Sequence, residues 1–577
     1  MAERFEAVVI GTGFGGAVAA CRLGKRWPGK VLVLERGKRY PMGSFPRSPH
    51  DMARNFWNLP DETVRRPRRL RAAESHGMWD IRSFRHMDVV LGAGLGGGSL
   101  VYANVFLEPP GHVFDGRWPA SAKKEQLARY FGIAKRVLGA RPVPRNADPR
   151  RRILRTELFE RYAAEVGRKS ELVDINVFFG NDLEHPDDPL PIGEQARNRY
   201  GALQTSCVYC AECDVGCNVH AKNTLDLNYL FVAEQSHQAV VKTECLAVRI
   251  APLGAGGEPD PAAGGEHGYR VWYRDLTRPG SGEIEVRAER VVVSAGTIGS
   301  NELLLRCRDV DRTLPNVSRE LGKGYSGNGD FLSFVIGTDR PAEPNYGPVI
   351  TQRTDFDLYE NFDPERAFLF EDASYPAFAS WFVEGAKPGF MRLGAFGRML
   401  RHAWSRFVDG HSMGSMGYAL GDLLSGDLSY NTAVLLCMGF DRSDGVISLD
   451  HAGRADIDWP YRNSRPLYDA ILGAGRRFSE VFGAKAFVPL PTWHWPARKN
   501  VSVHSLGGCR LAGDPAAGVT SADPASFGEV FGYRNLYVAD GAILPTAVGA
   551  NPTATITALA EMVAEGITGI EPDERLV

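Results

Sequence analysis

"AVVIGTGFGGAVAACRLGKRWPGKVLVLERG", residues 7–37, combines an apolar strand, a glycine turn, a small-residue helix and a second strand in that order. Gly11, Gly13 and Gly16 have the G-x-G-x-x-G spacing. The first glycine allows a tight turn, the second lets the backbone approach a pyrophosphate, and the third lets helix and strand pack closely. Glu35 ends the second strand and can accept hydrogen bonds from ribose hydroxyls. An ordinary glycine turn is the alternative, but the flanking strands favour a dinucleotide-binding unit, for NAD or FAD.

Length and charge set the class of protein. The 577 residues exceed the size of one ordinary core, so two or more interleaved domains are expected. The 67 Lys and Arg residues nearly balance the 69 Asp and Glu residues, which argues against nucleic acid as a partner. The sequence shows no secretory signal pattern, and no stretch has the roughly 20 apolar residues of a spanning helix. We therefore expect a cytoplasmic protein that keeps its nine cysteines reduced.

Three distant stretches decide between the two cofactors. Residues 89–110, "VVLGAGLGGGSLVYANVFLEPP", form a second glycine loop. Residues 290–309 have the pattern of a strand, a turn and a helix, and residues 535–567 that of a strand, a loop and a C-terminal helix. With the N-terminal unit, and in this order, they resemble the glucose-methanol-choline (GMC) family of FAD oxidoreductases, and within it the cholesterol oxidase branch. The resemblance runs from about residue 6 to residue 567.

The resemblance implies a particular layout of domains. It predicts an α/β fold with a discontinuous, Rossmann-like FAD-binding domain and a substrate domain built on a large mixed or antiparallel β-sheet flanked by helices. We expect the FAD-binding domain to comprise residues 1–44, 222–330 and 510–577. The substrate domain is then expected to comprise residues 45–221 and 331–509.

The same resemblance implies which residues hold the flavin. The N–H groups at the start of the C-terminal helix, near Thr553, would lie beside the flavin pyrimidine and stabilise the negative charge that builds on reduction. Tyr102 stands where the oxidases have Asn, which leaves oxygen or another electron acceptor open, and Asn104 offers a replacement polar contact. The expected cofactor-binding residues are Gly11, Gly13, Phe14, Gly15, Gly16, Glu35, Gly92, Gly97, Gly98, Ser99, Asn104, Ala295, Gly296, Asp540, Gly541, Asn551, Pro552 and Thr553.

His504 in "VSVHSLGGCRL" and Asn551 in "VGANPTATITALAE" are the first catalytic candidates. In the family that the chain resembles, the matching His and Asn face the reactive edge of the flavin and the substrate hydroxyl. Alcohol oxidation moves a hydride to the flavin while the hydroxyl proton leaves, so a nearby group must accept that proton. We expect His504 to act as base or proton relay and Asn551 to position the alcohol. A structural histidine and an ordinary helix cap before proline are the alternatives.

Glu371 in "FLFEDASYPAF" is a third catalytic candidate. It corresponds in order to the acid that sterol oxidases use for double-bond isomerisation and to help deprotonate the alcohol. A carboxylate among aromatic side chains is poorly solvated, which raises its pKa towards useful proton transfer. A surface glutamate on a hairpin is the alternative. Its expected aromatic neighbours are Phe368, Phe370, Tyr375 and Phe378.

Four cysteines in "CVYCAECDVGC", residues 207–217, follow the C-x2-C-x2-C-x3-C spacing of bacterial ferredoxins. The spacing predicts a [4Fe-4S] cluster, from which electrons could leave one at a time to an acceptor protein. Zinc and unmetallated thiols are the alternatives. The fourth ligand would be Cys217 itself or a distant cysteine, Cys245, Cys307 or Cys437. The expected metal ligands are Cys207, Cys210, Cys213 and Cys217.

Residues 387–410 place apolar side chains at helical spacing with arginines between them. Such a stripe is often core-facing, but a basic amphipathic helix also suits a lid over an apolar pocket or a peripheral membrane contact through residues 388–408. The basic run at 65–71 predicts a solvated face.

Taken together, these features predict FAD-dependent oxidation of a bulky, apolar, sterol-like alcohol to a ketone by hydride transfer to the flavin. The partner would be a hydrophobic small-molecule alcohol, with an electron-acceptor protein if the iron-sulfur cluster is present. One alternative is a GMC protein like the hydroxynitrile lyases, with structural FAD. Another is a non-catalytic electron-transfer subunit.

Overall fold

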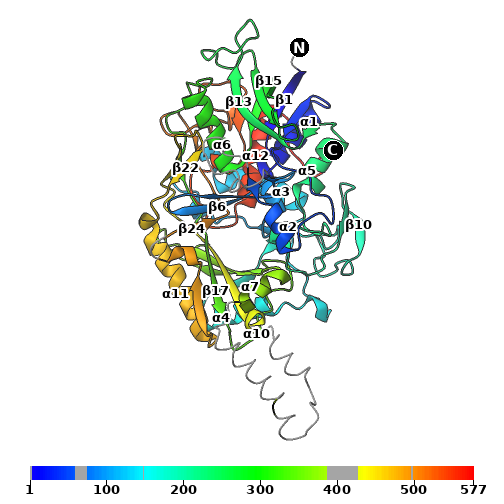
Figure 1. Cartoon of the computed structure of the whole chain (residues 1–577), viewed down its shortest axis with the longest axis vertical. Coiled ribbons are helices and arrows are strands. Elements are labelled where there is room, and N and C mark those ends of the chain that lie inside the picture. Colours follow the sequence, from blue (N-terminus) through cyan, green and yellow to red (C-terminus); the bar gives the residue numbers. More distant parts are fainter. Residues whose placement is uncertain (1–2, 59–74, 147, 386–403, 405–426, 495–497) are drawn as a thin grey trace.

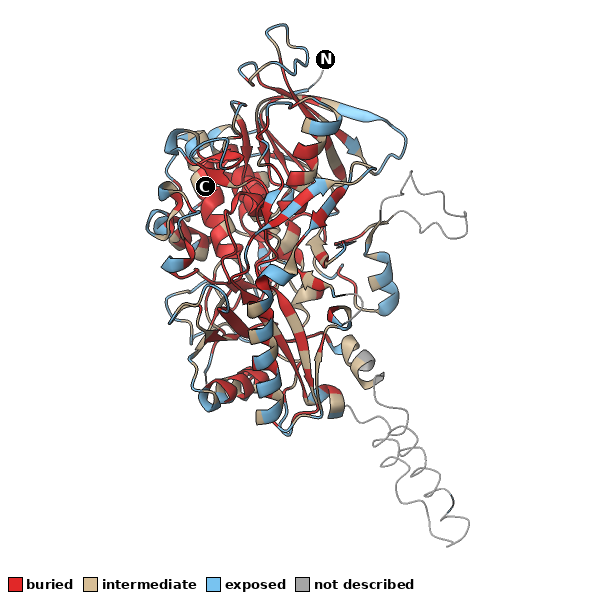
Figure 2. Cartoon of the chain, turned by 90° about the vertical axis from the view of Figure 1, so that its left-hand side faces the viewer, coloured by how far each residue is buried: buried red, intermediate tan, exposed pale blue. Residues whose placement is uncertain are grey.

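The computed structural model describes residues 3–58, 75–146, 148–385, 404, 427–494 and 498–577. The chain forms two lobes stacked along its long axis, and buried residues fill the interior of both (Figure 1, Figure 2). The basic run at 65–71 and nearly all of the 387–410 segment lie outside the described residues. Within the described part of the chain, no helix is both long and apolar enough to cross a membrane.

The upper lobe is built on a seven-stranded sheet in the order β12-β2-β1-β15-β14-β13, with β27 also paired to β15. β12, β2, β1, β15 and β27 run parallel, and β14 and β13 continue the sheet as antiparallel strands. The strands therefore come from three distant parts of the chain. They are β1 (Glu3–Ile10), β2 (Val31–Leu34), β12 (Val240–Lys242), β13 (Cys245–Pro252), β14 (Tyr269–Asp275), β15 (Glu283–Val293) and β27 (Leu536–Val538).

The lower lobe contains a six-stranded sheet in the order β23-β17-β20-β19-β18-β8, in which every neighbouring pair is antiparallel. Helices α4 and α11 cover it, and rings of Phe159, Tyr162, Phe370 and Phe478 pack between helices and sheet, with centroids 4.8–5.9 Å apart. The strands are β8 (Ser170–Leu172), β17 (Phe331–Ile336), β18 (Gln352–Phe356), β19 (Phe368–Ala373), β20 (Thr432–Gly439) and β23 (Ala486–Pro489).

Smaller elements complete the fold. β6 pairs with β5 and β24 in a three-stranded sheet between the lobes (Figure 1), and β21 pairs with β16 and β22 in another. These strands are β5 (Trp79–Ser83), β6 (Met87–Gly92), β24 (Asn500–Ser502), β16 (Lys323–Tyr325), β21 (Gly445–Leu449) and β22 (Ala455–Asp458). The two-stranded pairs join β3 (Trp57–Asn58) to β4 (Ser75–His76), β7 (Val105–Phe106) to β9 (Asp174–Ile175), β10 (Gln195–Arg197) to β11 (Leu203–Thr205), and β25 (Leu511–Ala512) to β26 (Thr520–Ser521).

The described helices are α1 (Phe14–Arg26), α2 (Pro49–Arg54), α3 (Lys124–Val137), α4 (Leu154–Glu165), α5 (Tyr229–Gln235), α6 (Gly296–Leu305), α7 (Ser380–Gly385), α10 (Asp427–Tyr430), α11 (Arg465–Val481) and α12 (Thr553–Thr568). The architecture confirms the predicted α/β class, with a discontinuous Rossmann-like unit and a large antiparallel sheet flanked by helices. The domain boundaries stay a prediction.

Helices α1 and α12 pack against each other and are joined by a buried ion pair. Nε of Arg22 lies 2.7 Å from Oε2 of Glu561, and these side chains are 6% and 0% exposed. Tyr229 on α5 donates a hydrogen bond to the other oxygen of Glu561. Because the carboxylate and the guanidinium are both paired, the cost of removing two charges from water is offset locally. The first and last helices of the chain therefore hold a fixed relative position.

The glycine turn before α1 brings backbone segments closer than side chains permit. Gly11 adopts a left-handed conformation with φ of +96°. A Cβ on Gly16 would lie 2.0 Å from the carbonyl oxygen of Gly11, and one on Gly15 would lie 1.3 Å from that of Ala539. A Cβ on Gly13 would have no protein atom within 4 Å. Among the four glycines of this turn, Gly13 is the one at which a side chain would meet no protein atom.

Alanine substitutions at Gly13 and Gly15 should separate the effect on folding from the effect on cofactor binding. We expect Gly15→Ala to lower the free energy of unfolding by about 1–3 kcal/mol or more, since its methyl group meets backbone. Gly13→Ala should leave the stability of the cofactor-free protein nearly unchanged but reduce the FAD content of the purified protein. Urea unfolding and flavin absorbance measure the two quantities, and a Gly13→Ala protein with full FAD content would contradict the expectation.

Candidate active site

A cavity of about 660 Å³ lies between the two lobes, a volume within the range of small-molecule and cofactor sites. Its upper part is formed by the ends of the parallel strands and by both glycine loops. Its lower part is formed by the large antiparallel sheet, through Leu332 and Phe334 on β17 and Val434 and Leu436 on β20. The cavity is therefore polar and glycine-rich at one end and apolar at the other.

Most of the expected cofactor residues line this cavity. Gly16, Ser99 and Asn104 do not: Gly16 packs on Gly11, the Ser99 hydroxyl donates to the backbone of Gly96, and Asn104 is fully buried. The lining residues among those expected are Gly11, Gly13, Phe14, Gly15, Glu35, Gly92, Gly97, Gly98, Ala295, Gly296, Asp540, Gly541, Asn551, Pro552 and Thr553.

The carboxylate of Glu35 is fixed at the nucleotide end of the cavity. It accepts hydrogen bonds from the backbone and hydroxyl of Thr12 and from the N–H of Gly37. Burial raises the pKa of this carboxyl, and the three hydrogen bonds oppose that rise by stabilising the charged form. The side chain is thus held at the end of β2, where the dinucleotide motif requires an acceptor for ribose.

Arginines at this end of the cavity carry no local sequence signal, and sequence reasoning missed them. Arg36 and Arg82 both pair with Asp80, and Arg82 also pairs with Glu302. Burial alone would raise the pKa of Asp80, but the two guanidinium groups lower it below its usual value. Arg36, Arg82 and Arg306 line the cavity and place positive charge on its wall, where a bound phosphate group could pair with it.

The start of α12 faces the same cavity. Asn551 and Pro552 precede its first turn, and Thr553 begins it. Unpaired N–H groups at a helix start carry partial positive charge and favour an anion. Oδ1 of Asn551, on the cavity wall, is among the buried polar atoms of the described residues that have no hydrogen-bond partner. An unpaired acceptor here can pair with a bound polar group, so this end fits the flavin ring of FAD.

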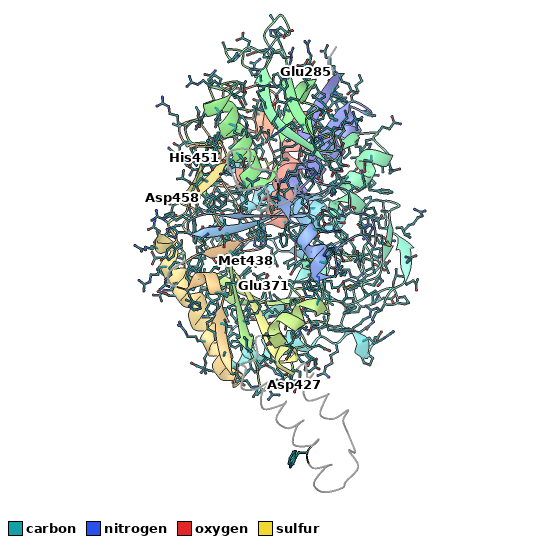
Figure 3. The ribbon with its side chains drawn as sticks, viewed as in Figure 1. Glu285, Glu371, Asp427, Met438, His451 and Asp458 are labelled. Atoms are coloured by element: carbon teal, nitrogen blue, oxygen red, sulfur yellow. The ribbon has the colours of Figure 1, made fainter. Side chains whose placement is uncertain are left out.

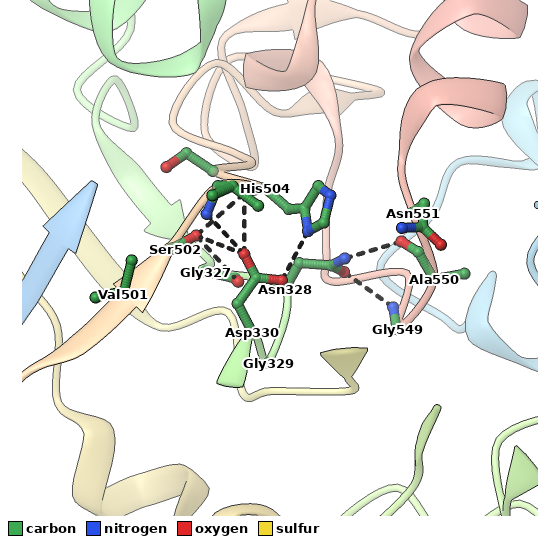
Figure 4. Close-up of polar contacts among 12 residues, drawn as sticks. Gly327, Asn328, Gly329, Asp330, Val501, Ser502, His504, Gly549, Ala550 and Asn551 are labelled. Atoms are coloured by element: carbon green, nitrogen blue, oxygen red, sulfur yellow. Dashed lines mark hydrogen bonds and ion pairs between the residues drawn. The ribbon is translucent and has the colours of Figure 1, made fainter. Parts of the chain in front are cut away.

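His504 and Asn551 both line the cavity, although they lie on different elements (Figure 4). His504 follows β24, and its side chain is 16% exposed. Nδ1 of its ring lies 2.7 Å from Oδ1 of Asp330. Asn551 is 4% exposed, and its Nδ2 lies 3.5 Å from Oε2 of Glu371. The structure therefore brings an imidazole and a carboxamide to one chamber.

Glu371 lies on β19 in the lower lobe and is fully buried, so the alternative of a surface glutamate is wrong (Figure 3). Burial raises its pKa well above the usual value, and the hydrogen bond from Asn551 only partly opposes this. Its carboxyl group does not line the cavity but accepts a hydrogen bond from Nδ2 of Asn551. The structure thus places Glu371 as a partner of Asn551 and not as a wall of the chamber.

The four cysteines of the 207–217 loop are free thiols with unequal exposure: Cys207 is buried, Cys213 and Cys217 are half-buried, and Cys210 is exposed. Backbone N–H groups donate to the sulfurs of Cys207 and Cys217. Within the described ranges, no three His, Cys, Asp or Glu side chains form a group able to hold a metal ion. The structure therefore gives no support to the predicted iron-sulfur or zinc site, although burial and then the charges of the three other thiols raise the pKa of Cys207.

Lys222 attaches this cysteine loop to the second glycine loop. Its buried ammonium group donates to the carbonyl oxygens of Leu100, Tyr102 and Cys213, and it lies 4.8 Å from the centre of the Tyr102 ring. Burial lowers the pKa of Lys222 to about 8. Asp214, next to Cys213, lines the cavity. The cysteine loop is therefore part of the cavity's surroundings, which the sequence did not indicate.

Comparison with known proteins agrees with this geometry. Residues 441–560 match a family model described as GMC oxidoreductase. The chain is 28% identical to a cholesterol oxidase of Acinetobacter baumannii, over 96% of this chain and 93% of that protein. It is 27% identical to a cholesterol oxidase of Mycobacterium tuberculosis, over 98% and 91%. A long-chain-alcohol oxidase of Arabidopsis thaliana is 21% identical, over 97% and 66%.

Solved structures share the fold. A pyridoxine 4-oxidase from Mesorbium loti superposes with a TM-score of 0.57 at 15% identity, covering 97% of this chain and 98% of that one. A fungal aryl-alcohol oxidase superposes with a TM-score of 0.51 at 16% identity, covering 99% of both chains. These structures show a shared fold, and the sequence matches show that the chain is similar to GMC oxidoreductases, through residues 441–560 and through cholesterol oxidases aligned over nearly its full length.

Proposed function

We propose that the protein oxidises a bulky, apolar, sterol-like alcohol to a ketone, with His504 and Asn551 at the substrate hydroxyl. The observation that carries the proposal is the single cavity in which a dinucleotide cradle, these two side chains and an apolar wall meet. FAD, when bound, supplies the hydride acceptor. The relatives named as cholesterol and long-chain-alcohol oxidases support a CH–OH donor as the substrate class.

The chain's own residues perform the proton chemistry. The imidazole of His504 accepts the hydroxyl proton, a contribution that is typically worth about 10²- to 10⁴-fold in rate. The carboxamide of Asn551 orients the alcohol, and its Oδ1, which accepts no hydrogen bond from the described residues, can bind the hydroxyl. The carboxyl group of Glu371 accepts a hydrogen bond from the Asn551 amide and so fixes its orientation. The start of α12 provides partial positive charge where negative charge builds during the reaction.

The apolar wall supports a hydrophobic substrate. Leu332, Phe334, Val434 and Leu436 present side chains from two adjacent strands of the antiparallel sheet. Such a surface discriminates against polar alcohols, because burying a polar group without a hydrogen-bond partner costs about 1–3 kcal/mol in proteins. The lid or membrane contact through 388–408 remains a prediction, as does the division into an FAD-binding and a substrate domain.

Replacing His504 should slow flavin reduction without emptying the cofactor site. In the absence of oxygen, a sterol-like secondary alcohol should bleach the flavin of the parent protein. His504→Ala should reduce that rate by about 10²- to 10⁴-fold. His237→Gln is the matched control, since the ring of His237 bonds the backbone of Leu576 and does not line the cavity. A parental rate in His504→Ala would contradict the assignment, and a flavin that no alcohol bleaches would favour a lyase.

Glu371→Gln should change how stability depends on pH. Because its pKa is raised on folding, Glu371 retains a proton that the unfolded chain releases above its ordinary pKa of about 4.3. The parent should therefore lose stability relative to Glu371→Gln as pH rises through that value towards the folded pKa, by at most about 1.4 kcal/mol per pH unit. Urea unfolding from pH 4 to 9 measures the difference. A difference independent of pH would show that the carboxyl group titrates normally.

The iron-sulfur hypothesis for the cysteine loop stays a prediction that metal analysis can test. A [4Fe-4S] cluster requires roughly four irons per chain and an absorbance shoulder beyond the flavin bands. Protein purified without oxygen is the sample to analyse, with a Cys207→Ser variant as the comparison. About one zinc per chain would indicate the zinc alternative. The absence of both metals would show that the four cysteines are unmetallated thiols.

A further inference from the structure

The short turn at residues 326–330, "SGNGD", contacts both chain segments that carry the proposed catalytic side chains (Figure 4). It follows β16 and precedes β17, far in sequence from either segment. All five of its residues are buried, and Asn328 and Gly329 adopt left-handed conformations with φ of +55° and +63°. We call this segment the 326–330 turn.

Asp330 holds the backbone and the ring of His504 at once. Its Oδ2 accepts hydrogen bonds from the N–H groups of Val503 and His504, at 2.8 and 3.0 Å. Its Oδ1 lies 2.7 Å from Nδ1 of the imidazole, and the carboxylate is 2% exposed. A carboxylate that accepts backbone N–H groups has no hydrogen to give, so the hydrogen in the third contact belongs to Nδ1. The neutral ring then carries its lone pair on Nε2.

Asn328, two residues earlier, holds the segment that leads to Asn551. Its Oδ1 accepts hydrogen bonds from the N–H groups of Val548 and Gly549, at 3.0 and 2.9 Å. Its Nδ2 donates to the carbonyl oxygen of Ala550, at 2.8 Å. The side chain is fully buried, and each of these contacts lies within three residues of Asn551. The backbone before the proposed substrate-positioning amide is therefore fixed by one carboxamide.

The turn is itself fixed by Asp441. This buried carboxylate accepts hydrogen bonds from the N–H groups of Gly327 and Gly329, both at 3.1 Å, and from the hydroxyl of Ser326 at 2.7 Å. A Cβ on Gly329 would lie 2.5 Å from the backbone of Gly439, so the turn also requires glycine there. These contacts fix the conformation of the 326–330 turn, and the turn fixes the position of the two segments that are hydrogen-bonded to it.

We propose that the 326–330 turn is the positioning element of the redox site. Asp330 sets the tautomer and the orientation of His504, Asn328 sets the backbone before Asn551, and the turn fixes the spacing between the two side chains. When the alcohol O–H bond breaks, its electron pair stays on oxygen and the proton forms a bond to Nε2. The positive charge on the ring is then stabilised by the Asp330 carboxylate, which does not take the proton. The catalytic part of this inference rests on the proposed function, but the tautomer does not.

The tautomer can be measured without any substrate. In protein labelled with ring-¹⁵N histidine, His504→Gln identifies the signals of His504 by difference. We expect Nδ1 of the neutral ring to show the shift of a protonated nitrogen and Nε2 that of an unprotonated one. The opposite tautomer in the parent protein would overturn the assignment of Asp330, whatever reaction the protein catalyses.

Asp330→Asn should test the catalytic consequence. The amide can still accept the backbone N–H groups, but its NH₂ then faces Nδ1 and favours the other tautomer. We expect the rate of flavin reduction at saturating alcohol to fall by about 10²- to 10⁴-fold with KM and FAD content little changed. Asp355→Asn is the matched control, since Asp355 accepts backbone N–H groups of Leu358 and Tyr359 without a histidine partner. Its rate should stay near the parental rate.

The outcomes separate the two proposals. A changed tautomer with a parental rate would overturn the role of Asp330, and a parent whose flavin no alcohol bleaches would overturn the proposed function alone. If Asp330→Asn fails to fold, the tautomer of the parent still decides. Asn328→Asp, which removes the donor to Ala550, should lower the rate while leaving the His504 tautomer unchanged. A parental rate in that variant would remove Asn328 from the positioning element.

Discussion

The close approach of α1 to the end of β27 is the constraint on which the rest of the structure depends. No side chain fits between Gly15 and the carbonyl of Ala539, so the first helix lies directly on the strand that leads into the last one. The buried pair of Arg22 and Glu561 then fixes α12 along α1. Since Asn551 immediately precedes α12, its position in the cavity is set by backbone contact at the opposite end of the chain.

Buried polar groups connect the parts of the site that come from the two lobes. Asp330, Asp441 and Asn328 are each removed from water and each accept or donate several hydrogen bonds. Such groups cost free energy unless fully paired, and here the pairing is nearly complete. Among the described residues, Oδ1 of Asn551 is one of the buried polar atoms that stay unpaired, and it lies on the cavity wall. The framework around the cavity is thus fixed by paired groups, while this oxygen is left to bind a ligand.

Sequence reasoning identified residues of the cavity where a local pattern marks them and missed those that only distant contacts mark. The glycine turn, Glu35 and the start of α12 can each be recognised from spacing within a short stretch, and all three line the cavity. Asp330 lies 174 residues before His504, and nothing near either position reveals the bond between them. Lys222 likewise fastens the glycine loop to the cysteine loop through contacts more than 100 residues apart. For the cysteines, spacing predicted a shared metal site, but whether the side chains can hold a metal depends on the conformation of the folded loop.

The seven-stranded sheet has a consequence for synthesis of the chain. Its parallel strands come from residues 3–34, from residues 240–293 and from residues 536–538, so the nucleotide lobe stays incomplete until the ribosome has passed residue 538. Domains generally fold as units during synthesis, N-terminal first. Here the end of β15 waits for β27, so the apolar edge at Val291, Val292 and Val293 stays unpaired until residues 536–538 have been made.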